Sequence, residues 1–209
     1  MSGKMNENNQ VSIIGEIASE FRFRRKVLGE AFYVFDVRIR RFSESADCIP
    51  VMISEKMLDV SQDYRGRCVC VTGEYRSYNI YKEEKSHLVL YVFAQEIAFE
   101  KEKINKDKNQ IYLDGHICRH PLYRKTPLGR EISEILMSVD RAYGKTDYIP
   151  CICWGKSARL SDRLEAGRRI RIGGRIQSRE YHKRLSGKKY ETRVAYEVSI
   201  SEMEVMESE

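Results

Sequence analysis

The chain has 209 residues, of which 42% are hydrophobic and 33% are charged, with a formal net charge of +6 at pH 7. This length suits two domains of roughly 100 residues. A membrane-spanning helix needs about 18–20 consecutive apolar residues, and no stretch of the sequence is that long. Residues 1–9 lack the apolar segment of a secretory signal, so we expect a cytoplasmic, nucleoid-associated protein.

The sequence repeats itself at a spacing of about 100 residues. Such a repeat is longer than a solenoid unit of about 20–50 residues and has the size of a small domain. We therefore expect two copies of one fold, at 1–99 and 110–209, joined by residues 100–109. The matching positions are Gly15 with Gly115, Leu28-Gly29 with Leu128-Gly129, Asp47 and Pro50 with Asp147 and Pro150, Gly73 with Gly174, and Ser77 with Ser178.

In the first copy, short runs of alternating apolar and polar residues predict five strands. A short helix is expected between the third and fourth strands, from Glu55 to about Gln62. The segment 100–109 is charged and nearly free of apolar residues, which is typical of a linker that holds two domains close without fixing their angle. The expected strands lie near residues 10–19, 31–42, 47–54, 67–78 and 87–98.

The second copy predicts the same order of elements. Its helix spans Lys156 to Leu164 and ends before Gly167. Five strands with one helix between the third and fourth are the order of an OB-fold, a small Greek-key barrel. We therefore predict an all-β protein of two tandem OB-fold barrels, each with a short helix. The second set of strands is expected near residues 110–118, 130–143, 146–154, 168–181 and 189–202.

Four of the six cysteines form two close pairs, Cys68 with Cys70 and Cys151 with Cys153. Neither pair has the spacing of a zinc site, and no His-rich partner segment follows. Both lie in alternating, strand-like runs, where a spacing of two puts both thiols on one face. We expect them in the core, with no metal and no cofactor.

Charge is divided unequally between the copies. Residues 1–99 hold 14 Lys and Arg against 14 Asp and Glu, whereas residues 110–201 hold 19 against 10. An excess of positive charge on one domain indicates a polyanionic partner, most often a nucleic acid. The solvated surface of a merely soluble protein explains the charge alone equally well.

The third strand of the second copy carries an aromatic row. Its small residues share one parity, which suits a barrel interior, so Tyr148 and Trp154 on the other parity are expected to point outward. The fourth strand, expected beside it, has Arg175, Arg179 and Tyr181 on its outer parity. Interleaved aromatic and cationic side chains stack on unpaired bases and contact the phosphates between them. This pattern favours sequence-tolerant binding of a single strand.

Several motifs of this copy resemble the bacterial single-stranded DNA-binding protein family. They are Thr126-Pro127-Leu128-Gly129, Val139-Asp140-Arg141, Trp154-Gly155-Lys156, and Gly174 followed by Arg179-Glu180-Tyr181. The resemblance covers most of residues 110–200 and implies a non-enzymatic protein that binds single-stranded DNA in replication, repair or recombination. It implies base stacking by Trp154, Tyr148 and Tyr181, and phosphate contacts by Arg141, Lys156 and Arg179. Further cations expected around this face are Arg124, Lys125, Arg175 and Arg193.

The first copy resembles the family only faintly. Where the second copy has Tyr148, Trp154 and Tyr181, it has Cys48, Ser54 and Ile80. We expect either a weaker binding surface or a barrel kept mainly for dimerisation. Its candidate contact residues are Arg38, Arg40, Arg76, Tyr78 and Tyr81.

The family generally assembles four barrels, so the resemblance implies a homodimer. The acidic C-terminal residues 201–209 contain no Pro or Phe, so recruitment of other proteins through an acidic tip is doubtful. Two alternatives remain open at this stage: an OB-fold adaptor in a replication-restart type complex, and RNA as the ligand, since stacking alone does not distinguish the sugars.

Overall fold

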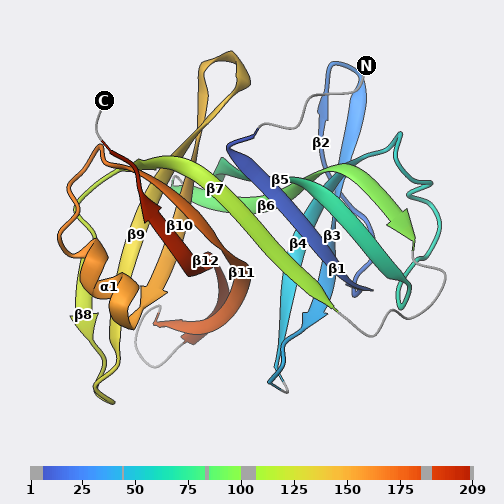
Figure 1. The fold of residues 1–209 in the computed structure, drawn as a ribbon. Coiled ribbons are helices and arrows are strands. Elements are labelled where there is room, and N and C mark those ends of the chain that lie inside the picture. Colours follow the sequence, from blue (N-terminus) through green and yellow to red (C-terminus); the bar gives the residue numbers. More distant parts are fainter. Residues whose placement is uncertain (1–6, 44, 83–84, 100–106, 185–189, 208–209) are drawn as a thin grey trace.

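The computed structural model describes residues 7–43, 45–82, 85–99, 107–184 and 190–207, and these form two β-barrels side by side (Figure 1). The first barrel contains β1 (Asn9–Ile17), β2 (Arg22–Val27), β3 (Glu30–Arg40), β4 (Ala46–Ser54), β5 (Cys68–Lys82) and β6 (Lys85–Phe99). The second contains β7 (Lys108–Ile117), β8 (Leu122–Lys125), β9 (Glu131–Arg141), β10 (Lys145–Trp154), α1 (Gly155–Ser161), β11 (Arg169–Arg184) and β12 (Tyr190–Val205), with a 3-10 turn at Ala142–Gly144.

The twelve strands form one continuous sheet whose order is the same when followed outward from its centre in either direction. The order is β2-β3-β4-β6-β5-β1-β7-β11-β12-β10-β9-β8. Pairing of β3 with β1 and of β7 with β9 closes the two barrels. In each barrel the third long strand pairs in parallel with the last one, β4 with β6 and β10 with β12. This is the OB-fold arrangement expected from the sequence.

All ten predicted strands are present, and their apolar parity faces the barrel interiors. Two further strands, β2 and β8, were not predicted, because both are short and at least half of the residues in each are charged. Each pairs with the neighbouring long strand at the outer edge of the sheet, where charged side chains remain in water.

The predicted helix of the second barrel is present, but that of the first is not. In α1, Ala158 and Ser161 are buried and pack the helix on the barrel. Residues 55–62 form turns instead. There the Ser54 hydroxyl accepts a hydrogen bond from the backbone of Lys56 (3.2 Å), and Asp59 accepts one from the backbone of Ser61 (3.1 Å). Such side-chain contacts compete with helical hydrogen bonds, so this part of the prediction is wrong.

The repeated glycines mark places where two strands touch. A Cβ atom on Gly115 would lie 2.3 Å from the carbonyl oxygen of Ser138, and one on Gly15 would lie 2.5 Å from that of Arg38. In each barrel this is where the first strand crosses onto the strand that closes the barrel. The sequence repeat at these positions therefore reflects packing.

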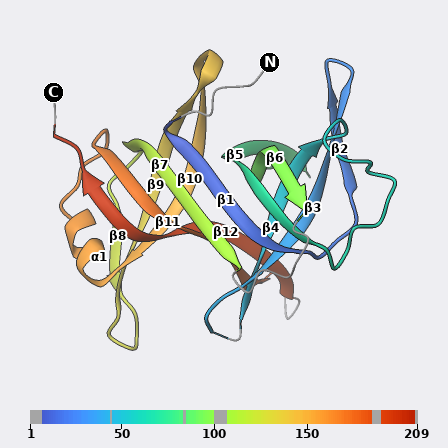
Figure 2. The ribbon, with the colours of Figure 1, turned by 45° about the vertical axis from the view of Figure 1, so that its right-hand side comes forward.

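The barrels are joined by β1 and β7, which pair antiparallel from Asn9 opposite Leu113 to Ile14 opposite Lys108. Figure 2 shows the two strands side by side at the centre of the molecule. The sequence predicts a linker over residues 100–109 that leaves the angle between the barrels free. This is wrong, because β7 begins at Lys108 and its pairing with β1 fixes that angle; residues 100–106 lie outside the described part of the chain.

Reciprocal polar contacts reinforce this junction, which we call the seam. Asp47 of the first barrel accepts a hydrogen bond from the backbone of Ser178 in the second (2.8 Å). Asp147 of the second accepts one from the backbone of Ser77 in the first (2.6 Å). Both carboxylates are buried, with exposed fractions of 1% and 0%. The seam thus has approximate two-fold symmetry within one chain.

The cysteine prediction is half right. Cys151 and Cys153 are buried in the second barrel, as expected, and burial raises the pKa of both thiols. Cys68 and Cys70 are only half-buried. The buried face of β5 is the opposite one, where Val69 and Val71 fill the interior of the first barrel. Within the described ranges, no three His, Cys, Asp or Glu side chains gather as metal ligands, and no helix is long and apolar enough to cross a membrane.

Candidate nucleic-acid interface

The outward row of β10 carries two of the predicted aromatic residues. Trp154 is 43% exposed and Tyr148 is 47% exposed, whereas Ile149, Cys151 and Cys153 of the opposite row are buried. The predicted orientation of this strand is therefore confirmed. Trp154 is the last residue of β10 and directly precedes α1.

Tyr181, the third predicted aromatic residue, is placed differently from the expectation. The fourth strand β11 does not lie beside β10, because β12 pairs between them. Tyr181 instead lines a groove of about 560 Å³ between the barrels, together with Pro150 from the outward row of β10. The groove therefore links Tyr181 to the row that carries Tyr148 and Trp154. Its other wall belongs to the first barrel and includes Arg22 and Phe23.

Most of the predicted cations on the second barrel are exposed. Lys125 and Lys156 form no ion pair with any residue that the structure describes. Arg124 pairs with a glutamate of β9 at 2.6 Å, and Arg179 lies 3.8 Å from one on β12. Arg193 is half-buried and pairs with a glutamate two residues away at 2.7 Å. The pair of Arg124 is exposed on both sides and contributes only about 0–1 kcal/mol, so a phosphate can displace its glutamate at low cost.

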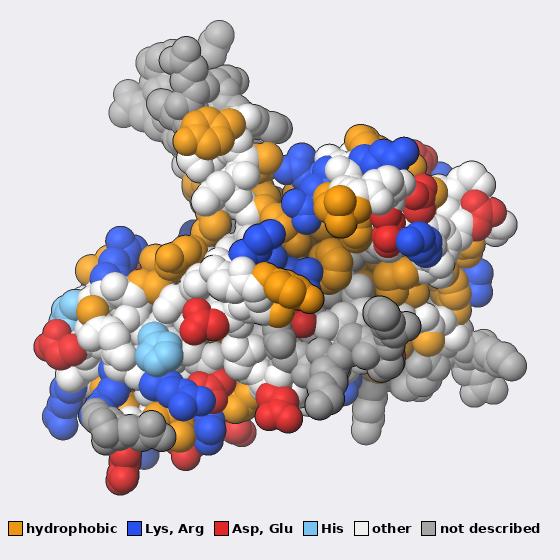
Figure 3. Space-filling model, turned by 90° about the horizontal axis from the view of Figure 1, so that it is seen from above, with side chains coloured by type: hydrophobic (Ala, Val, Ile, Leu, Met, Phe, Trp, Pro, Cys, Tyr) orange, Lys and Arg blue, Asp and Glu red, His pale blue; other side chains and the backbone are white. Residues whose placement is uncertain are grey.

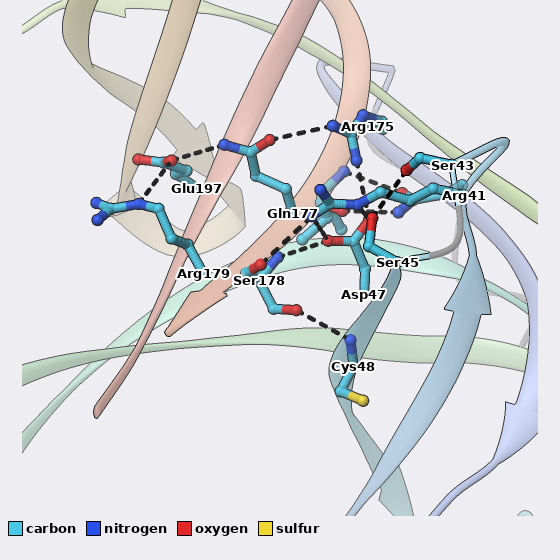
Figure 4. A network of polar contacts seen from close by, with 12 residues as sticks. Arg41, Ser43, Ser45, Asp47, Cys48, Arg175, Gln177, Ser178, Arg179 and Glu197 are labelled. Carbon is cyan, nitrogen blue, oxygen red and sulfur yellow. Dashed lines mark hydrogen bonds and ion pairs between the residues drawn. The ribbon is translucent and has the colours of Figure 1, made fainter. Parts of the chain in front are cut away.

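Arg175 points into the seam, away from the outward row of β10. It donates a hydrogen bond to Asp47 at 2.9 Å, and Arg41 binds the same carboxylate (Figure 4). Figure 4 also shows Gln177 and Glu197 continuing this network toward Arg179. Arg175 therefore holds the barrels together. No local sequence pattern indicates its partner, because Asp47 is 128 residues away.

Arg141 is also drawn into the seam. Its guanidinium pairs with Asp147 at 2.8 Å, and its side chain is 15% exposed. Burial raises the pKa of Asp147, and the hydrogen bond from Ser77 and the charge of Arg141 partly oppose that shift. The expected phosphate contact thus lies at the edge of the junction between the barrels, beside Tyr78, whose ring centroid is 5.6 Å from the guanidinium carbon.

The first barrel's candidates fall into three groups. Arg38 and Arg40 are exposed and pair with Glu16 and Asp107, and Tyr81 is 79% exposed near the end of β5. Arg76 and Tyr78 are half-buried and lie in a second pocket, which Arg141 also lines.

Sequence reasoning missed the contribution of β2 and β3. Phe23, Arg25 and Phe32 line the two pockets between the barrels, and Phe23 is 61% exposed. The alternation of Phe and Arg over residues 21–25 is the sequence signal that could have located them.

Comparison with known proteins identifies the class of the second barrel. Residues 108–206 match the model of the "Single-strand binding protein family". This match covers the second barrel, and it confirms the resemblance seen in its motifs. A single-stranded DNA-binding protein of Clostridium tetani is 33% identical over 93 residues, covering 41% of this chain and 64% of that protein. One from Bacillus cereus is 29% identical over 96 residues, covering 43% of this chain and 56% of that protein. The match therefore spans less than two thirds of these relatives.

The two-barrel arrangement also has a counterpart among solved structures. The wild-type single-stranded DNA binding protein from Thermus aquaticus superimposes with a TM-score of 0.75 at 20% identity. The superposition covers 96% of this chain and 94% of that one. A deletion mutant of the same protein gives a TM-score of 0.74. The likeness extends over both barrels and establishes the tandem OB-fold.

Proposed function

We propose that this protein binds single-stranded DNA without sequence preference and without catalysing a reaction. Trp154, Tyr148 and Tyr181 would stack on bases, and Lys156, Lys125 and Arg179 would contact phosphates. The observation that carries the proposal is the exposure of the aromatic row of β10 on a barrel of this family. Exposed aromatic residues on an OB barrel are costly to leave in water and are typical of base-stacking platforms.

Fluorescence of Trp154, the only tryptophan of the chain, tests this proposal directly. Titration with oligo(dT) should quench the emission, and the affinity should fall with salt by about 0.7 in log K per decade for each phosphate contact. Unchanged emission and unchanged anisotropy of a labelled oligo(dT) would contradict the proposal. Parallel titration with oligo(U) shows whether the sugar matters.

A matched pair of variants shows whether stacking is responsible. Trp154→Ala should weaken binding by about 1–3 kcal/mol, the contribution of one stacked base. Leu160→Ala is the control, because Leu160 lies on α1 and is 43% exposed, the same fraction as Trp154. Equal affinities of the two variants would mean that Trp154 does not stack on a base.

We also propose that the chain forms a homodimer with four barrels, and that it acts in the cytoplasm in replication, repair or recombination. The seam already joins β1 to β7 within one chain, so a dimer contact would use another surface. Sedimentation equilibrium tests this: a dimer has twice the 24.5 kDa of the chain, and a monomer at micromolar concentration would contradict it.

A further inference from the structure

A second pocket between the barrels combines aromatic rings with cations from both halves of the chain. It has a volume of about 400 Å³, and we call it the seam pocket. The β2–β3 hairpin and the β9–β10 connection both project at the top of the molecule in Figure 1. Seen from that side, hydrophobic side chains gather between the two halves with Lys and Arg side chains next to them (Figure 3). Among the lining residues are Arg25, Phe32, Tyr78 and Phe93 of the first barrel and Arg141 and Lys145 of the second.

A β-bulge brings Arg25 into this pocket. In the pairing of β2 with β3, Phe23 lies opposite Tyr33 and Arg25 lies opposite Phe32, so Arg24 is an extra residue. Residues directly opposite each other on paired strands share a face, and a bulge redirects the side chains that follow it. Without the bulge, Arg25 would lie opposite Ala31.

The aromatic residues of the pocket occupy different strands from those of the second barrel. Ser54 stands at the position that Trp154 has in the second barrel. Ser54 lies opposite Phe32 on β3, whereas Trp154 lies opposite Ile132 on β9. The rings of Phe32 and Phe93 are 5.8 Å apart. The first barrel thus has no aromatic residue at the end of β4, but it presents rings from β3, β5 and β6 nearby.

The cations of the pocket exceed the acids that pair with them. Arg76 pairs with Glu74, and Arg141 pairs with Asp147. Arg25 and Lys145 form no ion pair with a described residue, and Arg25 instead lies 4.5 Å from the ring centroid of Tyr78. Two positive charges are therefore left without a counter-ion beside a cluster of aromatic rings. Phosphate next to a base is the ligand chemistry that matches this combination.

Tyr78 adds a polar group that lacks a partner. Its hydroxyl is buried and makes no hydrogen bond to any described residue. A buried hydroxyl without a partner costs about 1–3 kcal/mol, so a ligand that supplies a donor or acceptor there is favoured.

We propose that the seam pocket is a second nucleotide subsite for single-stranded DNA, shared between the barrels. One base packs against Tyr78, Phe32 and Phe93, and an adjacent phosphate is held by Arg25 and Lys145. This inference rests on the proposed function, and it assigns the first barrel a binding role that depends on residues of the second. The bound strand then contacts both barrels of one chain.

The test uses two charge reversals on one strand, in the full-length chain. Arg25→Glu reverses a charge inside the pocket. Lys26→Glu, the control, makes the same change in net charge at the next residue of β2, which is exposed and does not line the pocket. Labelled oligo(dT) of about 35 nucleotides exceeds twice the 4–16 nucleotides that one OB barrel covers, and about 8 nucleotides lies within that range. Binding is measured by anisotropy and by Trp154 quenching.

We expect Arg25→Glu to weaken binding of the long oligonucleotide about tenfold more than Lys26→Glu, and to lower the salt slope by about 0.7. Quenching of Trp154 by the short oligonucleotide should be the same in both variants. Equal weakening by both variants would overturn the subsite while leaving the proposed function intact. Absence of binding by the wild-type protein would instead contradict the proposed function.

Photo-crosslinking gives a second readout that does not depend on a variant's stability. The wild-type protein is irradiated with oligonucleotides that carry 5-iodo-deoxyuridine, and the crosslinked peptides are identified by mass spectrometry. A crosslink to Tyr78, Phe32 or Phe93 supports the subsite. Crosslinks confined to Tyr148, Trp154 and Tyr181 would overturn it.

Discussion

Removal of the Asp47 carboxylate is expected to loosen the seam. Its side chain is 1% exposed and accepts hydrogen bonds from Arg41, Arg175 and the backbone of Ser178. Deletion of one partner of a buried ion pair costs about 3–5 kcal/mol. The two arginine side chains are 29% and 37% exposed and regain water, so the lower end applies. We expect Asp47→Ala to reduce the free energy of unfolding by about 3 kcal/mol and the Tm by about 6–12 °C.

Urea denaturation followed by two probes measures this effect. Circular dichroism reports on both barrels, whereas Trp154 fluorescence reports on the second alone. Coincident transitions in the wild type that separate in Asp47→Ala would show that the seam couples the barrels. Glu16→Ala is the control, because Glu16 forms an exposed pair with Arg38 at 3.0 Å, for which about 0–1 kcal/mol is expected. A loss in Asp47→Ala no larger than that of the control would refute the reasoning.

Two further predictions concern stability. Gly174→Ala should destabilise the second barrel, because the added Cβ would lie 2.3 Å from the carbonyl oxygen of Ser199. Gly173→Ala is the control, because the nearest atom to a Cβ at that position is 3.7 Å away, and its thermal unfolding should match that of the wild type. Equal losses of stability in both variants would contradict this explanation. The hydrogen bond from Arg169, with that from Arg171, lowers the pKa of Asp114, so its contribution is present above the ordinary carboxyl pKa of about 3.9 and is lost as the pH falls through the lowered value. The stability difference between wild type and Asp114→Asn, measured in urea from pH 7 to pH 3, should therefore shrink as the pH falls, and a constant difference would count against this explanation.

The repeat in the sequence reflects the contact between the two barrels as well as their common fold. In the sequence, Asp47 with Asp147 and Ser77 with Ser178 are only matching positions of the repeat. In the structure these residues meet across the seam, each aspartate bound to the serine of the other barrel. Residues that recur in a duplicated domain can thus reflect the contact between its copies as well as the packing within each copy.

The candidate site was predicted best where local alternation decides orientation. Strand parity is a short-range property, because successive side chains point to opposite faces, and so Trp154 and Tyr148 were placed correctly. The sequence predicts Arg141 and Arg175 to be exposed as well. Their guanidinium groups turn into the seam because each meets a carboxylate there, and no local pattern encodes such a partner.

The sequence by itself determined the strands, the division into two OB barrels and the outward aromatic row. Each of these follows from the period of apolar residues and from the repeat, which are properties of the chain read locally. Only the tertiary structure decided the angle between the barrels, the ion pairs of Arg141 and Arg175 in the seam, and the position of the seam pocket. These depend on the pairing of β1 with β7, on one bulge in β2 and on buried carboxylates whose partners lie far along the chain. Contacts of this kind join residues that are far apart in the sequence, such as Asp47 and Arg175, so no local pattern encodes them.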